Sequence, residues 1–440
     1  MRSMSRRSIS RRSLVSIATA GAAAPLMTRL RPLEAAAAQD AKAQITWLTN
    51  SDWPLEEFLA GFHGAHPDVE VVPEPLGFDA LQQQIQVRLG AKSETPDVIS
   101  VDVPNTPNFG YNDWLAPLDD VFNEDEKADM LESSIHAGSY DGKLLAAPVN
   151  TSTQLLYYNQ DIWDEAGVTP PGIDERWTWE QLVDAAQKLT ITGDDGSVEV
   201  WGFVPEQLNR IYQLGVLPAS LGGKQIGDDG ITVKGVIDGP EWVEAFTFYW
   251  KLFNEWKVGP QGEIFWPPDI FETGSLASFV GGPWNISRFA ESEAVTFNWG
   301  VSRHPFFAEG EPATPTGGWH IGINAFTKQM DAAQKFVHYM ATSAGNELWW
   351  RTGSGDMPAL KSVLAKFETD PEFGEPPLAY LKTAADEATV NPVPRANTVC
   401  FLSYESVLAA TFQDIRNGSD PAAALSQAAD RIQRECDRFA

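Results

Sequence analysis

Five short loops carry the residue types best suited to binding chemistry. Each places amides, hydroxyls or a carboxylate beside Gly, Pro or Trp. Amides and carboxylates hydrogen-bond hydroxyl groups, indole faces suit the C–H faces of sugar rings, and glycine lets the backbone approach a ligand. The mixture therefore indicates a site for a polyhydroxylated molecule. The loops read Asn50-Ser51-Asp52-Trp53, Asp102-Val103-Pro104-Asn105, Pro148-Val149-Asn150-Thr151, Gly281-Gly282-Pro283-Trp284-Asn285 and Gly317-Gly318-Trp319-His320.

The chain lacks the motifs that mark several common enzyme classes. It has no Gly-x-Ser-x-Gly elbow, Walker loop, HExxH or dinucleotide fingerprint. Its six histidines are scattered without paired ligand spacing, so we expect no metal and no cofactor. The 60 acidic residues make carboxylate pairs inevitable, however. A secreted glycosidase-like enzyme therefore stays the main alternative to a non-catalytic binder, with a secreted lectin as a third class.

Strands and helices alternate in the region that must position the first two loops. Short β-type runs over 45–48, 69–72 and 98–101 are separated by helical apolar spacing over 55–62 and 81–89. This β-α-β-α-β order predicts an α/β fold with a largely parallel sheet. Ligands of open α/β sheets bind beyond the carboxyl ends of the strands, where the first two loops fall. Further helix starts are predicted at Thr178, at Gly239-Pro240 and at Asp420-Pro421.

The first 38 residues have the pattern of an export signal. Arg11-Arg12 precedes a mildly apolar run over 14–27, and small residues follow at 35–38. This order is typical of a twin-arginine signal cleaved near Ala38. The run is shorter than the roughly 20 apolar residues that cross a bilayer as a helix. A basic tail on a cytoplasmic protein is the alternative interpretation.

The net charge and the length of the chain limit the kinds of partner and the number of domains that we expect. The net charge is −28, although residues 1–38 contain seven arginines and one glutamate, so the exported part is more negative still. Such a field disfavours binding to nucleic acid or to anionic lipid. About 400 residues exceed what one core organises, which predicts two domains. The 16 tryptophans are a weak indication of carbohydrate binding.

The sequence has two cysteines, and either a disulfide or unpaired thiols are compatible with it. Cys436 shares a helical face with Leu425, Ala429 and Ile432, so a buried unpaired thiol is the favoured interpretation. A bridge between Cys400 and Cys436 is the alternative in an oxidising compartment. Folding before twin-arginine export, in a reducing cytosol, argues mildly against the bridge.

A series of motifs in a fixed order covers nearly the whole chain after the signal. In that order the sequence resembles the extracellular solute-binding proteins of carbohydrate ABC importers, family 1, the maltose-binding-protein-like group. The resemblance covers roughly residues 41–436, and the joint order is more specific for the family than for any ligand. The motifs are Thr95-Pro96-Asp97-Val98, Trp114-Leu115-Ala116-Pro117-Leu118-Asp119, Tyr140-Asp141-Gly142-Lys143, Ala147-Pro148, Leu156-Tyr157-Tyr158-Asn159, Trp177-Thr178-Trp179-Glu180-Gln181-Leu182, Gly281-Gly282-Pro283-Trp284-Asn285-Ile286, Gly317-Gly318-Trp319 and Ala332-Ala333-Gln334-Lys335-Phe336-Val337.

The resemblance implies a type II-like periplasmic-binding-protein fold. Two lobes, each a β-sheet flanked by helices, would be joined by hinge crossings near Thr151, Pro315 and Pro358. On this basis we expect residues 41–151 and 316–357 in an N-terminal lobe. Residues 152–315 and 358–440 would form a C-terminal lobe.

By position, four residues of the first lobe match the family's ligand loops. Asn50 and Asp52 follow the first strand, although Asp52 equally suits the cap of the next helix. Asp102 falls where the family places a pocket carboxylate, although it also suits a turn before Pro104. Asn150 lies at the first crossing, where the backbone needs polar partners as well.

Four later residues complete the expected set. Trp284 matches the stacking aromatic of the Gly-Pro-Trp motif, with core packing as its alternative. Trp319 follows two glycines, a setting unusual for a deep core strand. Arg395 matches a loop that reaches the cleft in many relatives and would pair with an acidic ligand group, a hydroxyl cluster or a protein carboxylate. Tyr404 or its neighbour Glu405 is expected at the cleft wall.

The implied function is the capture of a mono- or disaccharide, or a glycoside, and its delivery to membrane permease subunits. No catalysis is expected. The protein would act as a monomer in the periplasm, or at the cell exterior where there is no outer membrane. The sequence does not identify the sugar or show whether it carries an acidic group.

Overall fold

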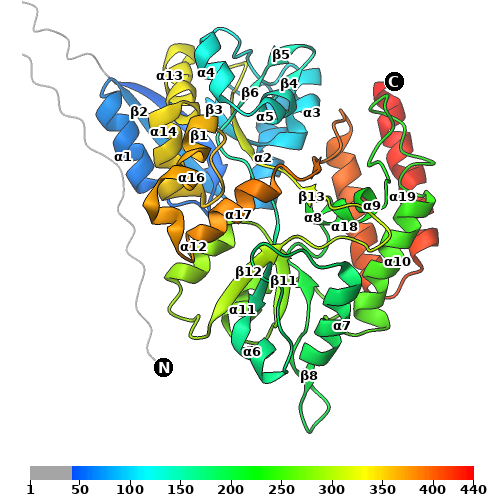
Figure 1. Ribbon diagram of the computed structural model, residues 1–440. Coiled ribbons are helices and arrows are strands. Elements are labelled where there is room, and N and C mark those ends of the chain that lie inside the picture. The colour runs from blue at the N-terminus through cyan, green and yellow to red at the C-terminus, as the bar shows by residue number, and fades with distance from the viewer. Residues whose placement is uncertain (1–41) are drawn as a thin grey trace, which may run out of the picture. The chain divides into compact units, whose positions relative to one another are not determined.

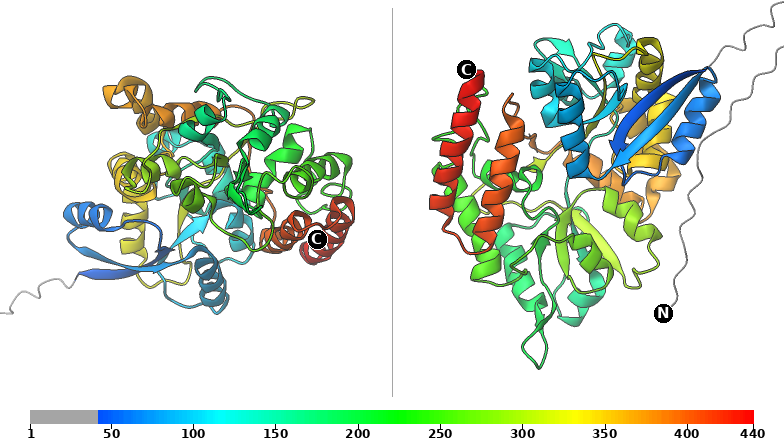
Figure 2. Two further views of the ribbon diagram at one scale, coloured as in Figure 1. Left: turned by 90° about the horizontal axis from the view of Figure 1, so that it is seen from below. Right: turned by 180° about the vertical axis from the view of Figure 1, so that it is seen from behind.

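The computed structural model describes residues 42–440, so the predicted export signal over 1–38 lies outside the described residues. Within the described part, two main β-sheets lie apart, and each is packed by its own helices (Figure 1). The view from behind in Figure 2 shows the same separation. The chain therefore has the predicted α/β class.

The first sheet has five strands in the order β2-β1-β3-β14-β6. β1 pairs parallel with β2 and β3, whereas β14 pairs antiparallel with β3 and β6. β14 comes from much later in the sequence than its neighbours, so this sheet is discontinuous in the chain. The strands are β1 (Ala43–Asn50), β2 (Val69–Leu76), β3 (Val98–Asp102), β6 (Ala146–Pro148) and β14 (Trp319–Ile323).

Both faces of the first sheet are buried, as parallel strands require. On one face, Trp47 packs against Phe58, Phe336 and Trp349. On the other face, Leu48 belongs to a separate apolar cluster. The helices and short elements of this region are α1 (Glu56–Ala65), α2 (Phe78–Gly90), η1 (Val103–Asn105), α3 (Thr106–Tyr111), α4 (Glu124–Asp129), α5 (Glu132–Ala137), β4 (Ser139–Tyr140), β5 (Lys143–Leu144), α13 (Met330–Ala341), α14 (Ser343–Trp349) and η2 (Trp350–Ser354).

The second sheet has four strands in the order β10-β11-β7-β12, with β7 antiparallel to both neighbours. Tyr157 of β7 stacks on Phe279 of β11 at 4.9 Å between ring centroids, so aromatic rings fill this core. Its elements are β7 (Leu155–Asn159), α6 (Gln160–Glu165), α7 (Trp179–Leu189), β8 (Ile191–Thr192), β9 (Val198–Val200), β10 (Val204–Pro205), α8 (Ile211–Leu214), α9 (Val216–Ser220), α10 (Pro240–Asn254), α11 (Pro267–Glu272), β11 (Ser278–Gly281), α12 (Trp284–Glu291) and β12 (Trp299–Arg303).

The remaining elements follow the two sheets or connect them. They are β13 (Thr314–Pro315), α15 (Lys361–Leu364), α16 (Lys366–Thr369), η3 (Pro371–Gly374), α17 (Ala379–Glu387), β15 (Pro392–Val393), α18 (Phe401–Arg416), α19 (Pro421–Cys436) and η4 (Asp437–Phe439). The predicted helix starts are confirmed. Thr178 and Gln181 form a capping box on α7, Gly239-Pro240 opens α10, and the Asp420 side chain accepts from Ala423 N on α19.

Three segments run side by side where the chain passes between the sheets, and we call residues 150–152, 316–318 and 355–357 the crossing segments. Thr151 pairs antiparallel with Met357, donating to its carbonyl at 2.8 Å and accepting from its N–H at 3.1 Å. Ser152 pairs in the same way with Gly317. The first crossing segment is thus hydrogen-bonded to both of the others.

Cys400 and Cys436 form a disulfide, so the favoured prediction of an unpaired thiol is wrong. α18 and α19 are two 16-residue helices that pack side by side. Their connection is short, so the chain reverses and the start of α18 lies beside the end of α19. Helical spacing identified the buried face of α19 but carries no information on which residue its end meets.

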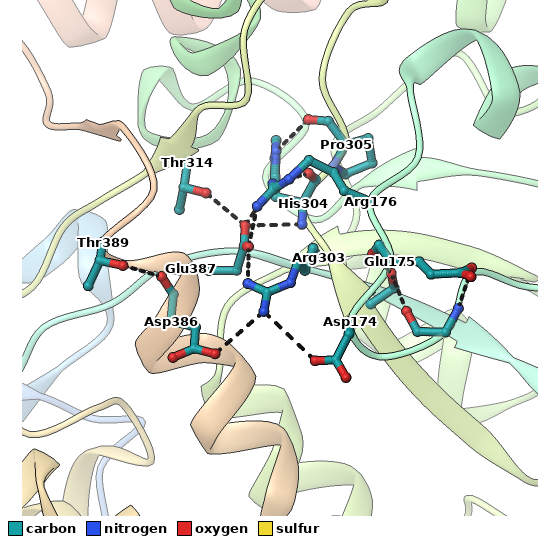
Figure 3. A network of polar contacts seen from close by, with 12 residues as sticks. Asp174, Glu175, Arg176, Arg303, His304, Pro305, Thr314, Asp386, Glu387 and Thr389 are labelled. Atoms are coloured by element: carbon teal, nitrogen blue, oxygen red, sulfur yellow. Dashed lines mark hydrogen bonds and ion pairs between the residues drawn. The ribbon is translucent and has the colours of Figure 1, made fainter. Parts of the chain in front are cut away.

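The buried carboxylate of Glu387, at the end of α17, is hydrogen-bonded to residues next to the second sheet (Figure 3). Glu387 accepts from both terminal nitrogens of Arg176, and from Arg303 Nη1 at 3.1 Å. It also accepts from Thr314 Oγ1 at 3.0 Å and from His304 N at 3.3 Å. Thr314 belongs to β13, which pairs with β15. The network therefore fixes both ends of the segment that leads to Arg395.

Glu387→Ala should lower the free energy of unfolding by about 3–5 kcal/mol, because it leaves Arg176 facing a buried site without its counter-charge and removes the buried partner of Arg303. Urea unfolding measures the change. Asp386→Ala is the matched control, since its 50% exposed side chain also pairs with Arg303 but should cost less than about 1 kcal/mol. Equal losses in the two variants would contradict the assigned role of Glu387.

Removing the disulfide should also destabilise the protein. The bridge closes a loop with a sequence separation of 36. Chain-entropy arguments for a loop of this size give about 4 kcal/mol for the Cys400→Ser, Cys436→Ser double variant. Unfolding of the oxidised protein, the reduced protein and the double variant checks this, and the last two should coincide. Equal stability of all three would refute it.

Candidate functional site

Asn150 joins the crossing segments through its side chain. Its Nδ2 donates to Asp356 Oδ2 at 2.8 Å, and its Oδ1 accepts from Trp319 N at 2.6 Å. The side chain is fully buried, so these hydrogen bonds replace the ones that water would otherwise supply. Asn150 thus fixes the start of β14 against the first and third crossing segments.

The two glycines before Trp319 allow the crossing segments to pack closely. A Cβ on Gly317 would lie 2.7 Å from the Tyr212 ring. A Cβ on Gly318, which has φ of +150°, would lie 2.5 Å from the carbonyl oxygen of Asn150. Both positions therefore require glycine for close approach. Trp319 is thereby held at the edge of the first sheet, in register with Asp102.

Asp102 and Arg395 form a bidentate ion pair between the end of β3 and the loop after β15. Arg395 Nη1 donates to Asp102 Oδ2 at 2.8 Å, and Nη2 donates to Oδ1. The two side chains are only 5% and 8% exposed, respectively. The guanidinium also lies 5.0 Å from the centre of the Tyr212 ring. Two predicted site residues are thus in direct contact, and Arg395 pairs with a protein carboxylate, one of its three expected partners.

Trp319 lies in an aromatic patch on the first-sheet side. Its ring meets Trp53 edge-on at 4.9 Å and Phe78 at 5.9 Å. All three side chains are partly exposed. The Phe78 ring centre also lies 4.8 Å from the guanidinium of Arg210, which lies between β10 and α8 in the region of the second sheet. The Trp319 ring is therefore partly exposed to solvent and is packed against two other aromatic rings.

Trp284 is held on the second-sheet side by a buried glutamate. Glu206 Oε1 accepts from Trp284 Nε1 at 2.8 Å and from Asn285 Nδ2 at 2.7 Å. Oε2 accepts from Gly282 N at 3.1 Å and from Gln213 Nε2 at 2.9 Å. The indole is half-buried, and its ring centre lies 6.5 Å from that of Tyr212. Both oxygens of Glu206 are therefore filled by four donors.

Burial dominates the electrostatics beneath Trp284. It raises the pKa of Glu206 to about 7, although the hydrogen bonds that Glu206 accepts lower it in part. Burial also raises the pKa of Asp356 well above its usual value, and the nearby Glu206 charge adds to this. Two carboxyl groups with raised pKa values thus lie close to the crossing segments.

The other predicted residues are placed less centrally. Asn50 is buried at the end of β1 and its Oδ1 accepts from Asp52 N at 3.1 Å, which makes a local turn. The Asp52 carboxylate is exposed. Tyr404 is fully buried and its hydroxyl donates to the Gln225 carbonyl at 2.7 Å. The structure therefore uses Tyr404 in packing, and it does not bring Tyr404 to the Asp102–Arg395 pair.

Sequence reasoning missed several residues that build this site. Trp53 stood in one of the quoted loops and its type was the available signal. Glu206, Tyr212 and Asp356 had no such signal, because single acidic or aromatic residues outside a motif are indistinguishable from surface or core residues. Their importance depends on the partners that the fold supplies.

We call the group formed by Asp102, Asn150, Tyr212, Trp284, Trp319 and Arg395 the junction. A cavity of about 480 Å³ lies elsewhere in the structure. It is lined by parts of α3, by His136, by the 139–142 turn and by residues 229–231, 397–399 and 439. None of the eight predicted site residues lines it. It adjoins the site through the Arg395 loop, where Asn108 Nδ2 donates to the Val399 carbonyl at 2.8 Å.

Two further findings concern residues 42–440 only. Over this range, no group of three or more His, Cys, Asp or Glu side chains is arranged to hold a metal ion. None of the helices in the same range is both long and apolar enough to cross a membrane.

The sequence matches a known family over residues 46–347, and that family is described as bacterial extracellular solute-binding protein. Among curated proteins, the chain is 25% identical over 325 residues to the sn-glycerol-3-phosphate-binding periplasmic protein UgpB of Escherichia coli K12. That alignment covers 70% of this chain and 72% of UgpB. It is 22% identical to the maltodextrin-binding protein MdxE of Bacillus subtilis, covering 70% of this chain and 66% of MdxE.

Among solved structures, the fold is similar to that of the ABC substrate-binding protein Lmo0181 from Listeria monocytogenes in complex with cycloalternan. The TM-score is 0.76 at 24% identity, over 89% of this chain and 98% of that one. At this identity the likeness concerns the fold. It supports the two-lobed periplasmic-binding-protein architecture that the sequence predicts.

The raised pKa of Glu206 predicts a pH-dependent stability. Between the usual value of 4.5 and about 7, the native state holds a proton that the unfolded chain has lost. The free energy of unfolding should therefore fall as pH rises from 5 to 8, by about 3 kcal/mol for this group. Glu206→Gln, which carries no titrating group, should lack this change.

Urea unfolding of both proteins at pH 5 and pH 8 measures the effect as a difference. His304 and His320, whose pKa values burial lowers to about 4, contribute equally to both proteins and cancel. Burial also raises the pKa of Asp356 in both proteins, so the difference reports Glu206 together with its effect on Asp356. A stability difference between wild type and variant that is the same at both pH values would show that Glu206 does not titrate in this range.

Proposed function

The chain belongs to the bacterial extracellular solute-binding proteins, and from this premise we propose that it captures a small carbohydrate between two lobes for an ABC importer. It would deliver a mono- or disaccharide, or a glycoside, to membrane permease subunits as a monomer. The relatives are named for both glycerol phosphate and maltodextrin ligands, so they support a polyhydroxylated ligand without naming it.

One observation carries the proposal. Half-buried indoles from the two sheets, Trp284 and Trp319, flank a single junction through a continuous series of contacts. Trp284 lies beside Tyr212, Tyr212 beneath Arg395, Arg395 on Asp102, and Asp102 opposite Trp319. Indoles and amides that converge from two separately packed halves provide the surfaces that sugar rings and hydroxyls use.

Closure would be driven by the ligand. A sugar that contacts both lobes only in the closed form shifts the equilibrium by its differential affinity for that form. We propose lobes of residues 41–151 with 316–357 and of residues 152–315 with 358–440. The paired crossing segments support hinges near Thr151, Pro315 and Pro358, because their few mutual hydrogen bonds form a narrow connection.

The proposed contact residues are Asn50, Asp52, Asp102, Trp284, Trp319 and Arg395. The two tryptophans supply stacking surfaces, and the polar groups supply acceptors and donors for hydroxyls. Tyr404 and Asn150 are left out because both are fully buried and their polar atoms are already bonded within the protein.

The site has features of a binder and not of a glycosidase. A glycosidase needs a pair of carboxyl groups that reach the scissile bond, one of them protonated as the acid. Glu206 has a suitable pKa, but it is fully buried and both its oxygens are occupied by protein donors. Asp102 is occupied by Arg395. We therefore propose that the protein has no catalysis of its own.

Export would follow the twin-arginine route, with residues 1–38 as the signal. The protein would then act in the periplasm or, without an outer membrane, at the cell exterior. This location fits the extracellular family to which the chain belongs.

A thermal-shift screen across neutral sugars tests the proposal. A bound sugar at about 100 times its Kd should stabilise the protein by about 2.7 kcal/mol. Calorimetry with that sugar should then show that Trp319→Ala weakens binding by at least about 1 kcal/mol, because stacking adds roughly 0.5–1.5 kcal/mol beyond area burial.

Trp266→Ala is the matched control, since this tryptophan is 38% exposed and lies at the start of α11. The bound sugar should be recovered unchanged after incubation. Its turnover would establish an enzyme instead, and an unchanged affinity of Trp319→Ala would remove this residue from the site.

A further inference from the structure

The positive charges at the junction are already used by protein carboxylates. The fork of Arg395 is filled by Asp102 through two hydrogen bonds. Arg210 donates to Asp79 Oδ1 at 2.8 Å and lies over Phe78. Of the Arg395 guanidinium nitrogens, Nε alone has no hydrogen-bond partner within residues 42–440. A single N–H cannot provide the paired donors with which arginine binds phosphate or carboxylate groups.

Further carboxyl groups surround this pair. Glu405 is close enough to Asp102 for the two to repel, and burial together with this repulsion raises the pKa of Glu405. Asp79, which pairs with Arg210, is a third carboxylate near Arg395. The surroundings of Arg395 thus hold three carboxyl groups, Asp79, Asp102 and Glu405, against the two guanidinium groups of Arg210 and Arg395. An anionic group brought here would meet a charge of its own sign.

We infer that Asp102 is a specificity-determining residue that makes the site select neutral carbohydrates and reject sugars bearing a phosphate or carboxylate group. The inference rests on the proposed function and specifies its substrate class. It depends on the geometry of the Asp102–Arg395 pair and on the identity of the groups around it.

The physical reason is competition for one guanidinium. A phosphate must displace Asp102 from Arg395 to gain a bidentate partner, and the displaced carboxylate would stay buried without a counter-charge, which is costly. A sugar hydroxyl needs no such displacement. It can donate to a carboxylate oxygen, which accepts more than one hydrogen bond, and leave the ion pair intact.

Calorimetry on the full chain with matched ligand pairs tests the inference. The pairs are maltose with maltose 1-phosphate, glucose with glucose 6-phosphate and with glucuronate, and glycerol with sn-glycerol 3-phosphate. In the wild type, each anion should bind at least about 100-fold more weakly than any neutral sugar that binds, because like-charge contact costs several kcal/mol. Binding of any of these anions as tightly as its neutral partner would overturn the inference.

Asp102→Asn should raise the affinity for at least one of the anions by about tenfold or more, since it frees the Arg395 charge while keeping the side-chain shape. Asp79→Asn is the matched control. It makes the same change of charge next to Arg210, but the Asp79 side chain is 87% exposed and solvent screens its charge, so anion affinity should change less than about twofold. Adding Arg395→Gln to Asp102→Asn should abolish the gain.

The outcomes separate the two proposals. Neutral-sugar binding by the wild type without an anion gain in Asp102→Asn would refute the role of Asp102 and leave the carbohydrate function standing. An equal gain in Asp79→Asn would also refute it, because net charge alone would then explain the change. Tight binding of sn-glycerol 3-phosphate by the wild type with no neutral sugar bound would overturn both.

Discussion

The need to satisfy buried backbone where the chain passes between its two sheets constrains the rest of this molecule. Three crossing segments meet there, and they supply each other's hydrogen bonds through the Thr151–Met357 and Ser152–Gly317 pairs. The Asn150 side chain completes the junction by bonding both Trp319 N and Asp356. Each buried backbone group left unpaired at such a point would cost about 1–3 kcal/mol. The position of Trp319 follows from this arrangement.

A second layer of polar contacts positions the groups that the crossing segments do not hold. On one side, Glu206 anchors Trp284 and the Gly282 backbone with filled oxygens. On the other side, the Glu387 network and the β13–β15 pair fix the segment that ends in Arg395 (Figure 3). The partly exposed tryptophans are thus supported by fully buried carboxylates. Rigid support of this kind reduces the conformational entropy that ligand binding would otherwise cost.

Part of this arrangement was predictable because it depends on local or periodic patterns. The strand-helix order of the first 60 described residues, the capping box at Thr178 and the Gly-Gly-Trp sequence at the start of β14 all depend on neighbours in the chain. The Asp102–Arg395 contact is different, since it joins residues 293 positions apart. The sequence suggested each member separately and left three kinds of partner open for Arg395. The disulfide was mispredicted for a related reason, because two helices had to fold back before their ends could meet.

By itself, the sequence determined the α/β class, the family, the starts of several helices and the residue types that a sugar site requires. These follow from hydrophobic period, capping chemistry and motif order, which are properties of short stretches of chain. Only the tertiary structure decided that Tyr404 packs in the core, that Cys400 meets Cys436, and that Glu206 holds Trp284. It also decided that Arg395 is neutralised by Asp102. A side chain's partners, burial and charge state are set by residues distant in sequence, and these become neighbours only when the sheets and crossing segments have formed.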